Sequence, residues 1–466
     1  MRLREMAGEG DAVATVRLSE ILGALSHALD LTEGQPPGHC LRATWIGMQI
    51  GAALGLEGAA LRDIYYTAMM KDLGCSSNAA RICALYLSDD IGLKRDSKAM
   101  GDSLPSVLGF VFSHTGLKAG LAERFRAILN VLQNGGRIVD ELIETRCGRG
   151  AAVAASLRLP QAVCDGIYAL DEHWNGGGRP DRLSGEAIPL PSRIALLAQV
   201  VDVFHRSSGR GAALAEVRRR SGSWFDPDLV TVFLDLAEAQ AFWDVLGSDE
   251  VEDIVIALEP TGTALAMDDD YLDDIARAFA HVIDSKSPFT LGHSERVATY
   301  ADLVAGELGY SEARRRWLRR AALLHDIGKL GVSNAILDKN GALDDEQWVE
   351  MRNHAVLSRR ILERVTPFRD MARIGGAHHE RLDGCGYPQG LPAAAIEPET
   401  RIVSVADVFD ALTADRPYRA AMPVAKVLAI MRAEVGRAFD PDCFAALERA
   451  LAATERSLGL PAAPAV

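Results

Sequence analysis

The chain has 466 residues and a formal net charge of −14, with 48% hydrophobic and 24% charged residues. This length is too great for one ordinary core and predicts at least two domains, while the composition excludes a disordered chain. The acidic balance disfavours general binding to DNA or RNA, because neutralised phosphates supply most of that affinity.

The seven cysteines are scattered and contain no Cys-x-x-Cys pair, which favours free thiols in a reducing cytosol. No apolar run is long enough to span a bilayer, and the N-terminus leads into no apolar signal region. We therefore expect a cytoplasmic protein without membrane contact.

Residues 12–245 are rich in Ala, Leu, Arg and Glu, and their apolar positions recur at three and four residues. This periodicity is typical of helices. Gly247 and Pro260 interrupt the pattern, so we expect a linker over residues 246–267. The sequence thus predicts a first helical domain that ends near residue 245.

A second helical domain is expected over residues 268–460, and it makes the whole chain all-α. Its first amphipathic stretch places four apolar residues on one face: Ile275, Phe279, Val282 and Ile283. Asp268 to Asp270 suit the N-terminus of this helix, where the helix dipole favours negative charge.

The two halves repeat four motifs in the same order. In the second motif of each half, an Asp lies 33 residues after the first His, as Asp72 follows His39 and Asp326 follows His293. The matched segments are Gly38-His39 with Gly292-His293, Lys71-Asp72 with His325-Asp326, Glu172 to Pro180 with Glu380 to Pro388, and Asp202-Val-Phe with Asp407-Val-Phe. An internal duplication into two tandem domains is the simplest interpretation.

The second half carries a set of imidazoles and carboxylates that suits iron, manganese or zinc. The absence of a thiolate argues against a closed structural zinc site. Seven candidate ligands exceed the needs of one ion, so we expect two metals, with Asp326 as the bridging carboxylate. The candidate metal ligands are His293, His325, Asp326, His354, His378, His379 and Asp407.

A pair of metals suits the cleavage of a phosphodiester. The metals neutralise its charge, clamp the attacking and leaving oxygens, and lower the pKa of a bound water towards ~7. Lys329 lies about one turn after His325-Asp326 and is expected to face the same cavity. We assign the catalytic roles to His325, Asp326 and Lys329.

His325-Asp-Ile-Gly-Lys329, with the His378 to Pro388 segment and Asp407 to Arg419, resembles the HD-GYP family of HD phosphohydrolases over about residues 270–450. The resemblance implies an all-helical domain, a centre of two iron or manganese ions, and hydrolysis of cyclic di-GMP to pGpG or GMP. It places the seven candidate ligands at the family's metal positions. It implies that Gly386, Tyr387 and Pro388 form a loop beside the substrate. Arg416 and Arg419 are candidate contacts to phosphate or guanine, because a planar guanidinium suits both, with a helix-end charge or a surface salt bridge as the alternative.

One departure from the family bears on the metal count. Phe289 stands where some members have a glutamate ligand for a third metal, and a phenyl ring cannot ligate. We therefore expect two metals per chain.

The first half has lost most of the corresponding ligands. Lys71 replaces the motif His, Arg146 stands at the place of His354, and Leu170-Asp171 replace the His pair. Cys75 takes the lysine position and Arg179 replaces the tyrosine. Of the ligand set, only His39, Asp72 and Asp202 remain. We expect a catalytically dead domain kept for regulation or dimerisation, in which Lys71 and Arg146 pair with Asp72 and Asp202.

Two other functions stay open from the sequence. One keeps the chemistry but changes the substrate to another cyclic dinucleotide, such as cyclic GMP-AMP, or to a nucleotide. The other is a non-catalytic receptor or scaffold for cyclic di-GMP, which the complete ligand set argues against. Homodimerisation and signalling-protein partners are both compatible with the sequence.

Overall fold

A computed structural model describes residues 17–98, 104–117, 119–260, 267–415 and 419–457. These residues form helices joined by loops, and none of them forms a named strand, so the predicted all-α class is confirmed. The first half contains α1 (Leu18–Thr32), α2 (His39–Ala53), α3 (Ala59–Met70), η1 (Cys75–Asn78), α4 (Ala79–Tyr86), α5 (Asp90–Ser97), α6 (Leu104–His114), α7 (Leu121–Ser156), α8 (Gln161–Tyr168), η2 (Gly185–Ala187), α9 (Leu190–Arg220), α10 (Pro227–Leu236), α11 (Gln240–Gly247) and α12 (Val251–Ala257).

The second half repeats this order with fewer helices before its long central one. It contains α13 (Asp269–Asp284), α14 (His293–Glu307), α15 (Glu312–Leu324), η3 (Ile327–Gly331), α16 (Asn334–Leu337), α17 (Asp345–Arg364), η4 (Thr366–Met371), α18 (Ala372–Ala377), η5 (Ala393–Ala395), α19 (Pro398–Thr413), α20 (Val424–Ala433) and α21 (Pro441–Ser457).

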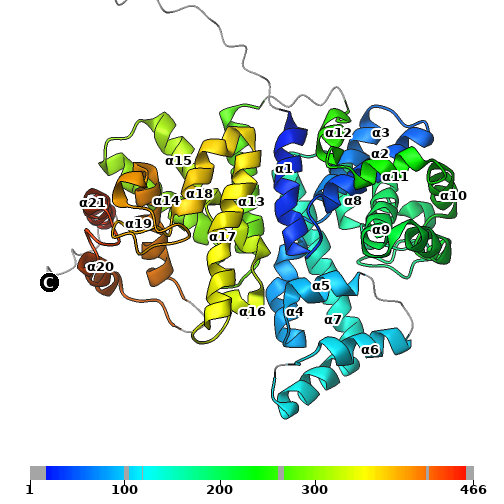
Figure 1. The fold of residues 1–466 in the computed structure, drawn as a ribbon, viewed down its shortest axis with the longest axis horizontal. Helices are drawn as coiled ribbons and strands as arrows, with labels where there is room; N and C mark the ends of the chain where they lie inside the picture. The colour runs from blue at the N-terminus through cyan, green and yellow to red at the C-terminus, as the bar shows by residue number, and fades with distance from the viewer. Residues whose placement is uncertain (1–16, 99–103, 118, 261–266, 416–418, 458–466) are drawn as a thin grey trace, which may run out of the picture.

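The first helix, α1, lies between the two halves (Figure 1). On one side it packs on α2 and α3, and on the other it packs on η3 and α17 of the second half. Helices α4 to α7 extend from the same junction, and α7 also contacts α13. The first half therefore adjoins the turn that carries the His325-Asp326 motif.

One continuous hydrophobic core runs through this junction. Leu22 and Leu25 of α1 belong to the same buried cluster as Phe279 of α13 and Leu330 of η3. A second cluster, built around Ile194 and Phe233, lies within the first half alone. The shared cluster predicts that the two halves stabilise each other, because burial of apolar surface is the main favourable contribution to folding.

The start of the second half agrees with the sequence. The Asp268 side chain accepts a hydrogen bond from Tyr271 N, which caps α13, and the four apolar residues predicted to share a face are all buried. The predicted linker over 246–267 differs in part, because it contains α12, which packs on α2. The domain bounds themselves stay a prediction.

Within the described part of the chain, no helix combines the length and the apolar character needed to cross a membrane.

Candidate metal centre in the second half

The His-Asp motif lies on a tight turn. Helix α15 ends before His325, and the chain enters the short helix η3 directly after Asp326. Gly328 packs so closely on the backbone carbonyl of His354 that a Cβ atom would collide with it. Its N–H donates to Ser358 Oγ at 2.9 Å. The turn therefore brings α17, and with it His354, directly onto the His-Asp motif.

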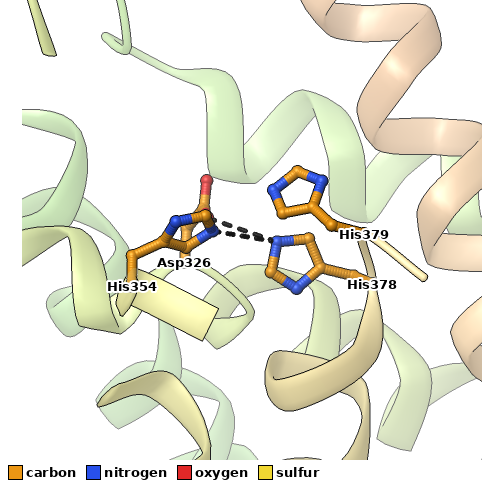
Figure 2. Close-up of side chains that lie close together, drawn as sticks. All are labelled: Asp326, His354, His378 and His379. Carbon is orange, nitrogen blue, oxygen red and sulfur yellow. Dashed lines mark hydrogen bonds and ion pairs between the residues drawn. The ribbon is translucent and has the colours of Figure 1, made fainter. Parts of the chain in front are cut away.

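The remaining candidate ligands come from three further elements. His293 is the first residue of α14, and its N-cap Gly292 adopts a left-handed conformation. His378 and His379 follow α18, and Asp407 lies in the middle of α19. Figure 2 shows Asp326, His354, His378 and His379 gathered in one place. The structure thus brings all seven predicted ligands together.

The seven residues form two groups, each with ligand atoms within 4.8 Å of one another. One group is Asp326, His354, His378 and His379, and the other is His293, His325 and Asp407.

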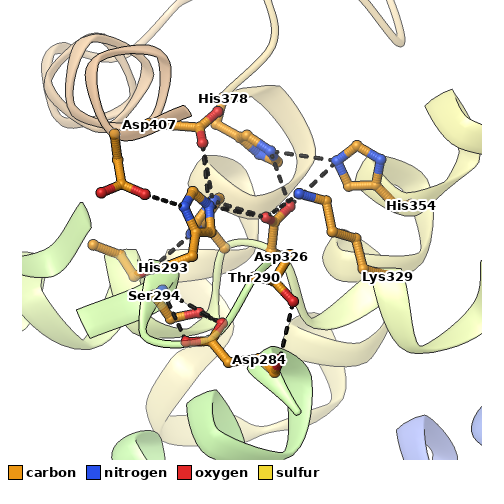
Figure 3. A network of polar contacts seen from close by, with 12 residues as sticks. Asp284, Thr290, His293, Ser294, Asp326, Lys329, His354, His378 and Asp407 are labelled. Atoms are coloured by element: carbon orange, nitrogen blue, oxygen red, sulfur yellow. Dashed lines mark hydrogen bonds and ion pairs between the residues drawn. The ribbon is translucent and has the colours of Figure 1, made fainter. Parts of the chain in front are cut away.

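The Asp326 carboxylate lies between these groups. Its Oδ1 is 3.4 Å from His354 Nε2 and 3.5 Å from His378 Nε2. Its Oδ2 is 3.2 Å from His325 Nε2 and 3.5 Å from His293 Nε2 (Figure 3). Each oxygen therefore faces a different group, as a carboxylate that bridges two ions requires.

The outer nitrogens of three imidazoles are already bound. The Nδ1 atom of His325 lies 2.6 Å from the carbonyl oxygen of Ala322, that of His354 lies 2.6 Å from Met351 O, and that of His378 lies 3.0 Å from Gly375 O. A carbonyl only accepts, so Nδ1 carries the proton and the Nε2 lone pair points into the site. Metal-ligating histidines are held in this way.

Several of the atoms that point into the site are buried and lack a hydrogen-bond partner in the described part of the chain, as expected of metal ligands. His293 Nε2, His325 Nε2 and Asp326 Oδ1 are fully buried, and none makes a hydrogen bond among the described residues. Buried polar atoms normally have partners, because an unpaired one costs about 1–3 kcal/mol. The donor set of imidazoles and carboxylates fits iron or manganese.

The electrostatics of the centre favour cations. Burial opposes a charge on His293, but the carboxylates of Asp326, Asp407 and Asp410 outweigh it and raise the pKa of His293 to about 10. On the other side, burial lowers the pKa of His354 to about 3 and holds that of His379 well below its usual range. The imidazoles of His354 and His379 are therefore neutral at neutral pH, whereas His293 lies among carboxylates that favour a positive charge.

Asp410 and Arg296 form a layer behind His293 that the sequence analysis missed. His293 Nδ1 lies 2.7 Å from Asp410 Oδ2, and Arg296 Nε donates to Asp410 Oδ1 at 2.6 Å. The carboxylate fixes the imidazole. Burial opposes the charge on Asp410, but its hydrogen bonds with His293 and Arg296 outweigh burial and lower the pKa of Asp410. The signal was the position of Asp410, one turn after Asp407 on the same helix.

Lys329 and the Gly-Tyr-Pro loop border the centre. Lys329 Nζ forms an ion pair with Asp326 Oδ2. The Tyr387 ring lies 4.7 Å from the His379 ring, and burial keeps the pKa of its hydroxyl above the usual value, so the hydroxyl can donate. Glu380 fixes the loop, because its carboxylate accepts from the N–H groups of Gln389 and Leu391.

Arg352 is a second residue that the sequence analysis missed. Its guanidinium carbon lies 5.5 Å from the centre of the Tyr387 ring. It stands two residues before His354 on α17, and nothing in its local pattern distinguishes it from a surface arginine. Only the packing of α17 against the Gly-Tyr-Pro loop reveals it.

The two arginines predicted to contact substrate are in different positions. Arg416 lies outside the described residues. Arg419 donates to the carbonyl oxygens of Leu412, Ala411 and Ala420, near the end of α19. The contacts of Arg419 in the structure are therefore those of a residue that satisfies helix-end carbonyls, and a substrate contact stays a prediction.

The first half repeats the framework of the site without its ligands. His39 Nδ1 lies 2.7 Å from Asp202 Oδ2, and Arg42 Nε donates to Asp202 Oδ1 at 2.6 Å. These contacts are those of His293 and Arg296 with Asp410.

The expected match of Asp202 with Asp407 is therefore wrong, since Asp202 corresponds to Asp410. A second ion pair supports this register. Arg193 lies nine residues before Asp202 and pairs with Asp226. Likewise, Arg401 lies nine residues before Asp410 and pairs with Asp440. Gln199 then stands at the place of Asp407. Of the seven ligands, the first half keeps only His39 and Asp72.

The cationic replacements pair partly as expected. Lys71 forms a buried ion pair with Asp72, which confirms that prediction. Arg146 pairs with Asp171 and not with Asp202, so that part of the prediction is wrong. The corresponding positions explain this pairing. Arg146 replaces His354 and Asp171 replaces His379, and these two histidines lie together in one ligand group of the second half.

Comparisons with known proteins agree with this geometry. The family model described as "HD domain" matches residues 117–229 and 277–443. A Vibrio cholerae protein named "3'3'-cGAMP-specific phosphodiesterase 3" is 54% identical over 94% of this chain and 95% of its own length.

Two further comparisons concern a relative that matches a smaller part of the chain and a solved structure. The cyclic di-GMP phosphodiesterase response regulator RpfG of Xanthomonas campestris is 41% identical over 39% of this chain and 48% of its own. The crystal structure of a cyclic GMP-AMP specific phosphodiesterase of V. cholerae, V-cGAP3, matches with a TM-score of 0.65 and 49% identity, over 93% of this chain and 97% of the other. The chain therefore belongs to the HD domain family and is a phosphodiesterase of its HD-GYP branch.

Proposed function

We propose that the protein hydrolyses a cyclic dinucleotide at the metal centre of its second half, and that its preferred substrate is 3'3'-cyclic GMP-AMP. The observation that carries the choice of substrate is the extent of similarity. The relative named for 3'3'-cGAMP matches through both halves of the chain, whereas the RpfG relative, named for cyclic di-GMP, matches over 39% of it. Cyclic di-GMP is the second candidate, as the HD-GYP resemblance implies.

The residues present would hold two divalent transition-metal ions, with iron or manganese as the candidates. When bound, such a pair neutralises the phosphodiester and activates a water molecule as nucleophile. His325, His354 and His378 are oriented for this role by their backbone partners. Asp326 offers one oxygen to each group of ligands.

Three side chains around the centre are placed to act on the substrate. Lys329 brings an ammonium to the carboxylate at the middle of the site, where it can bind a phosphate oxygen. Tyr387 supplies a protonated hydroxyl and an aromatic face for a base. Arg352 adds a guanidinium beside that ring, which suits a phosphate or a guanine.

The test is a direct comparison of substrates. The full chain, purified without oxygen and loaded with Fe(II) or Mn(II), is given 3'3'-cGAMP and cyclic di-GMP in separate and mixed reactions. We expect kcat/KM for 3'3'-cGAMP to exceed that for cyclic di-GMP by at least about tenfold, a difference of roughly 1.4 kcal/mol in transition-state binding. A preference for cyclic di-GMP would establish the second candidate. Turnover of neither, by metal-loaded protein, would contradict the proposed function.

A further inference from the structure

The first half contains a cavity of about 350 Å³ at the place that corresponds to the catalytic site. Arg146, Asp171 and Gln199 line it, at the positions of His354, His379 and Asp407 in the second half. Arg179 also lines it, at the position of Tyr387. The first half has thus retained the cavity, although other residues replace the metal ligands.

The wall of this cavity is cationic, in a chain whose net charge is −14. It contains Lys98, Arg146, Arg179 and Arg220, against the single carboxylate of Asp171.

Three of these cations are held by carboxylates that are not part of the wall. Glu33 binds Lys98 at 2.7 Å, Glu216 binds Arg220 at 2.5 Å, and Asp140 binds Arg179. The fourth, Arg146, pairs with Asp171 inside the wall. All four cations are therefore oriented by carboxylates, three of them from outside the cavity, and the side chains of the wall itself comprise four cations and one carboxylate.

Arg179 has N–H donors that remain available to a ligand. Its Nε is bound to Asp140 and its Nη1 donates to the carbonyls of Gly177 and Gly178. Among the described residues its Nη2 has no protein partner, and a quarter of the side chain is exposed (25%). A guanidinium has five N–H donors in a planar fork and binds phosphate with two of them.

Flat groups lie beside these cations. The His173 ring stacks on the Trp224 ring with centroids 4.0 Å apart, and the Arg220 guanidinium carbon lies 3.7 Å from the centre of the same ring. Burial, with Arg220 and Arg179 nearby, lowers the pKa of His173 to about 4, so its imidazole is neutral at neutral pH. A neutral planar wall beside a cationic one suits a base that carries a phosphate.

We propose that this cavity binds a purine nucleoside monophosphate, with the phosphate on Arg146 and Arg179 and the base against the layer that contains His173. Its volume is at the low end of the ~300–1,000 Å³ typical of ligand sites, which favours one nucleotide over a dinucleotide. The site is a binding site only, since it lacks the imidazoles that hold metal in the second half. It does not depend on which cyclic dinucleotide the second half cleaves.

The test is calorimetric titration of the metal-loaded full chain with GMP, CMP and inorganic phosphate. Two variants address the cavity. Arg179→Gln removes the partly exposed guanidinium, and Val139→Glu places a carboxylate on α7 in the wall, at a side chain that is 44% exposed. Because both positions are accessible, both variants should fold, and unchanged metal content would show that the second half is intact. Arg352→Gln is the matched control, because Arg352 lies on Tyr387, the counterpart of Arg179.

We expect GMP to bind at least tenfold more tightly than CMP or inorganic phosphate. Both cavity variants should weaken this binding at least tenfold, and Arg352→Gln should keep it. The proposal is overturned if the two cavity variants bind GMP like the unmodified chain, or if only Arg352→Gln loses it. Equal affinity for GMP, CMP and phosphate would equally contradict it.

Discussion

Asp410, which lies behind His293, allows a specific prediction for a single residue. Asp410 touches no other predicted ligand through a hydrogen bond, yet it fixes the His293 imidazole through Nδ1. Carboxylates in this position typically contribute a factor of 10–100 to metal affinity. We therefore expect Asp410→Asn to weaken metal binding roughly 10- to 100-fold, as measured by metal content after dialysis against graded chelator.

The duplication supplies the control for this variant. Asp202 makes the same two contacts, with His39 and Arg42, in the half that has lost its metal ligands. Asp202→Asn should therefore leave metal affinity unchanged. Equal losses in both variants would mean that Asp410 acts through general stability and not through His293.

Lys71 gives a prediction on stability. It is buried and its ammonium pairs with Asp72, whose pKa is held well below the usual range by Lys71 against the opposing effect of burial. Lys71→Met leaves the Asp72 charge buried without this partner, which typically costs about 3–5 kcal/mol. Urea unfolding should show this loss. The double variant Lys71→Met/Asp72→Asn should recover most of it, and a single variant as stable as the unmodified chain would refute the pairing.

Among the elements, α5 connects the first half to the catalytic turn. Asp90, the first residue of α5, accepts from Asn334 N at 2.7 Å and lies 3.7 Å from Lys286 Nζ. Lys286 in turn donates to the carbonyl of Leu330, the residue after Lys329. All of these groups are buried, and burial lowers the pKa of Lys286 to about 8 in spite of Asp90.

We expect Asp90→Ala to destabilise the protein by about 3–5 kcal/mol, because it leaves the Lys286 ammonium buried without its carboxylate. It should also lower kcat, since the support of the Lys329 turn is lost. The neighbouring Asp89 is exposed, caps α5 and contributes less than Asp90 to the charge environment of Lys286, so Asp89→Ala should cost about 0.5–2 kcal/mol and leave kcat unchanged. Unfolding and kinetic measurements on both variants test this, and an unchanged kcat in Asp90→Ala would remove the proposed link.

Element type was largely predictable from the sequence, and register was not. The apolar spacing of residues such as Ile275 and Phe279 fixes a helical face, and Asp268 marks its start. The Asp-Val-Phe match misplaced Asp202 by three residues, because a short motif on a helix recurs one turn away. The contacts of Asp202 with His39 and Arg42, together with the ion pair of Arg193 and Asp226, decide between the two registers.

In the candidate site, too, some residues were predictable from the sequence and others were not. His325 and Asp326 are adjacent in the chain, and five of the six histidines of the second half belong to the candidate ligands, so the sequence could group them. Arg352 and the cavity of the first half depend on how α17 and α7 pack against loops far away in the chain. No local pattern carries that information.

At the scale of the whole molecule, the second half does not have a separate core. Leu22 of α1 and Leu330 of η3 share one buried cluster, so removal of the first half exposes apolar surface beside the catalytic turn. We expect residues 268–466 expressed alone to aggregate or to unfold at a lower temperature than the full chain. Size-exclusion chromatography and thermal unfolding test this. A monomeric fragment with the stability of the full chain would show that the halves are independent.

We propose that the second half alone carries a two-metal site that cleaves a cyclic dinucleotide. The most direct measurement is hydrolysis of 3'3'-cGAMP by the Fe(II)- or Mn(II)-loaded full chain, with His325→Ala/Asp326→Ala and the matched Lys71→Ala/Asp72→Ala compared side by side and the metal content of each determined. We expect two metals per chain and turnover in the unmodified protein and in the first-half variant, and we expect the second-half variant to lose both the metals and the turnover. Turnover that survives in His325→Ala/Asp326→Ala would contradict it.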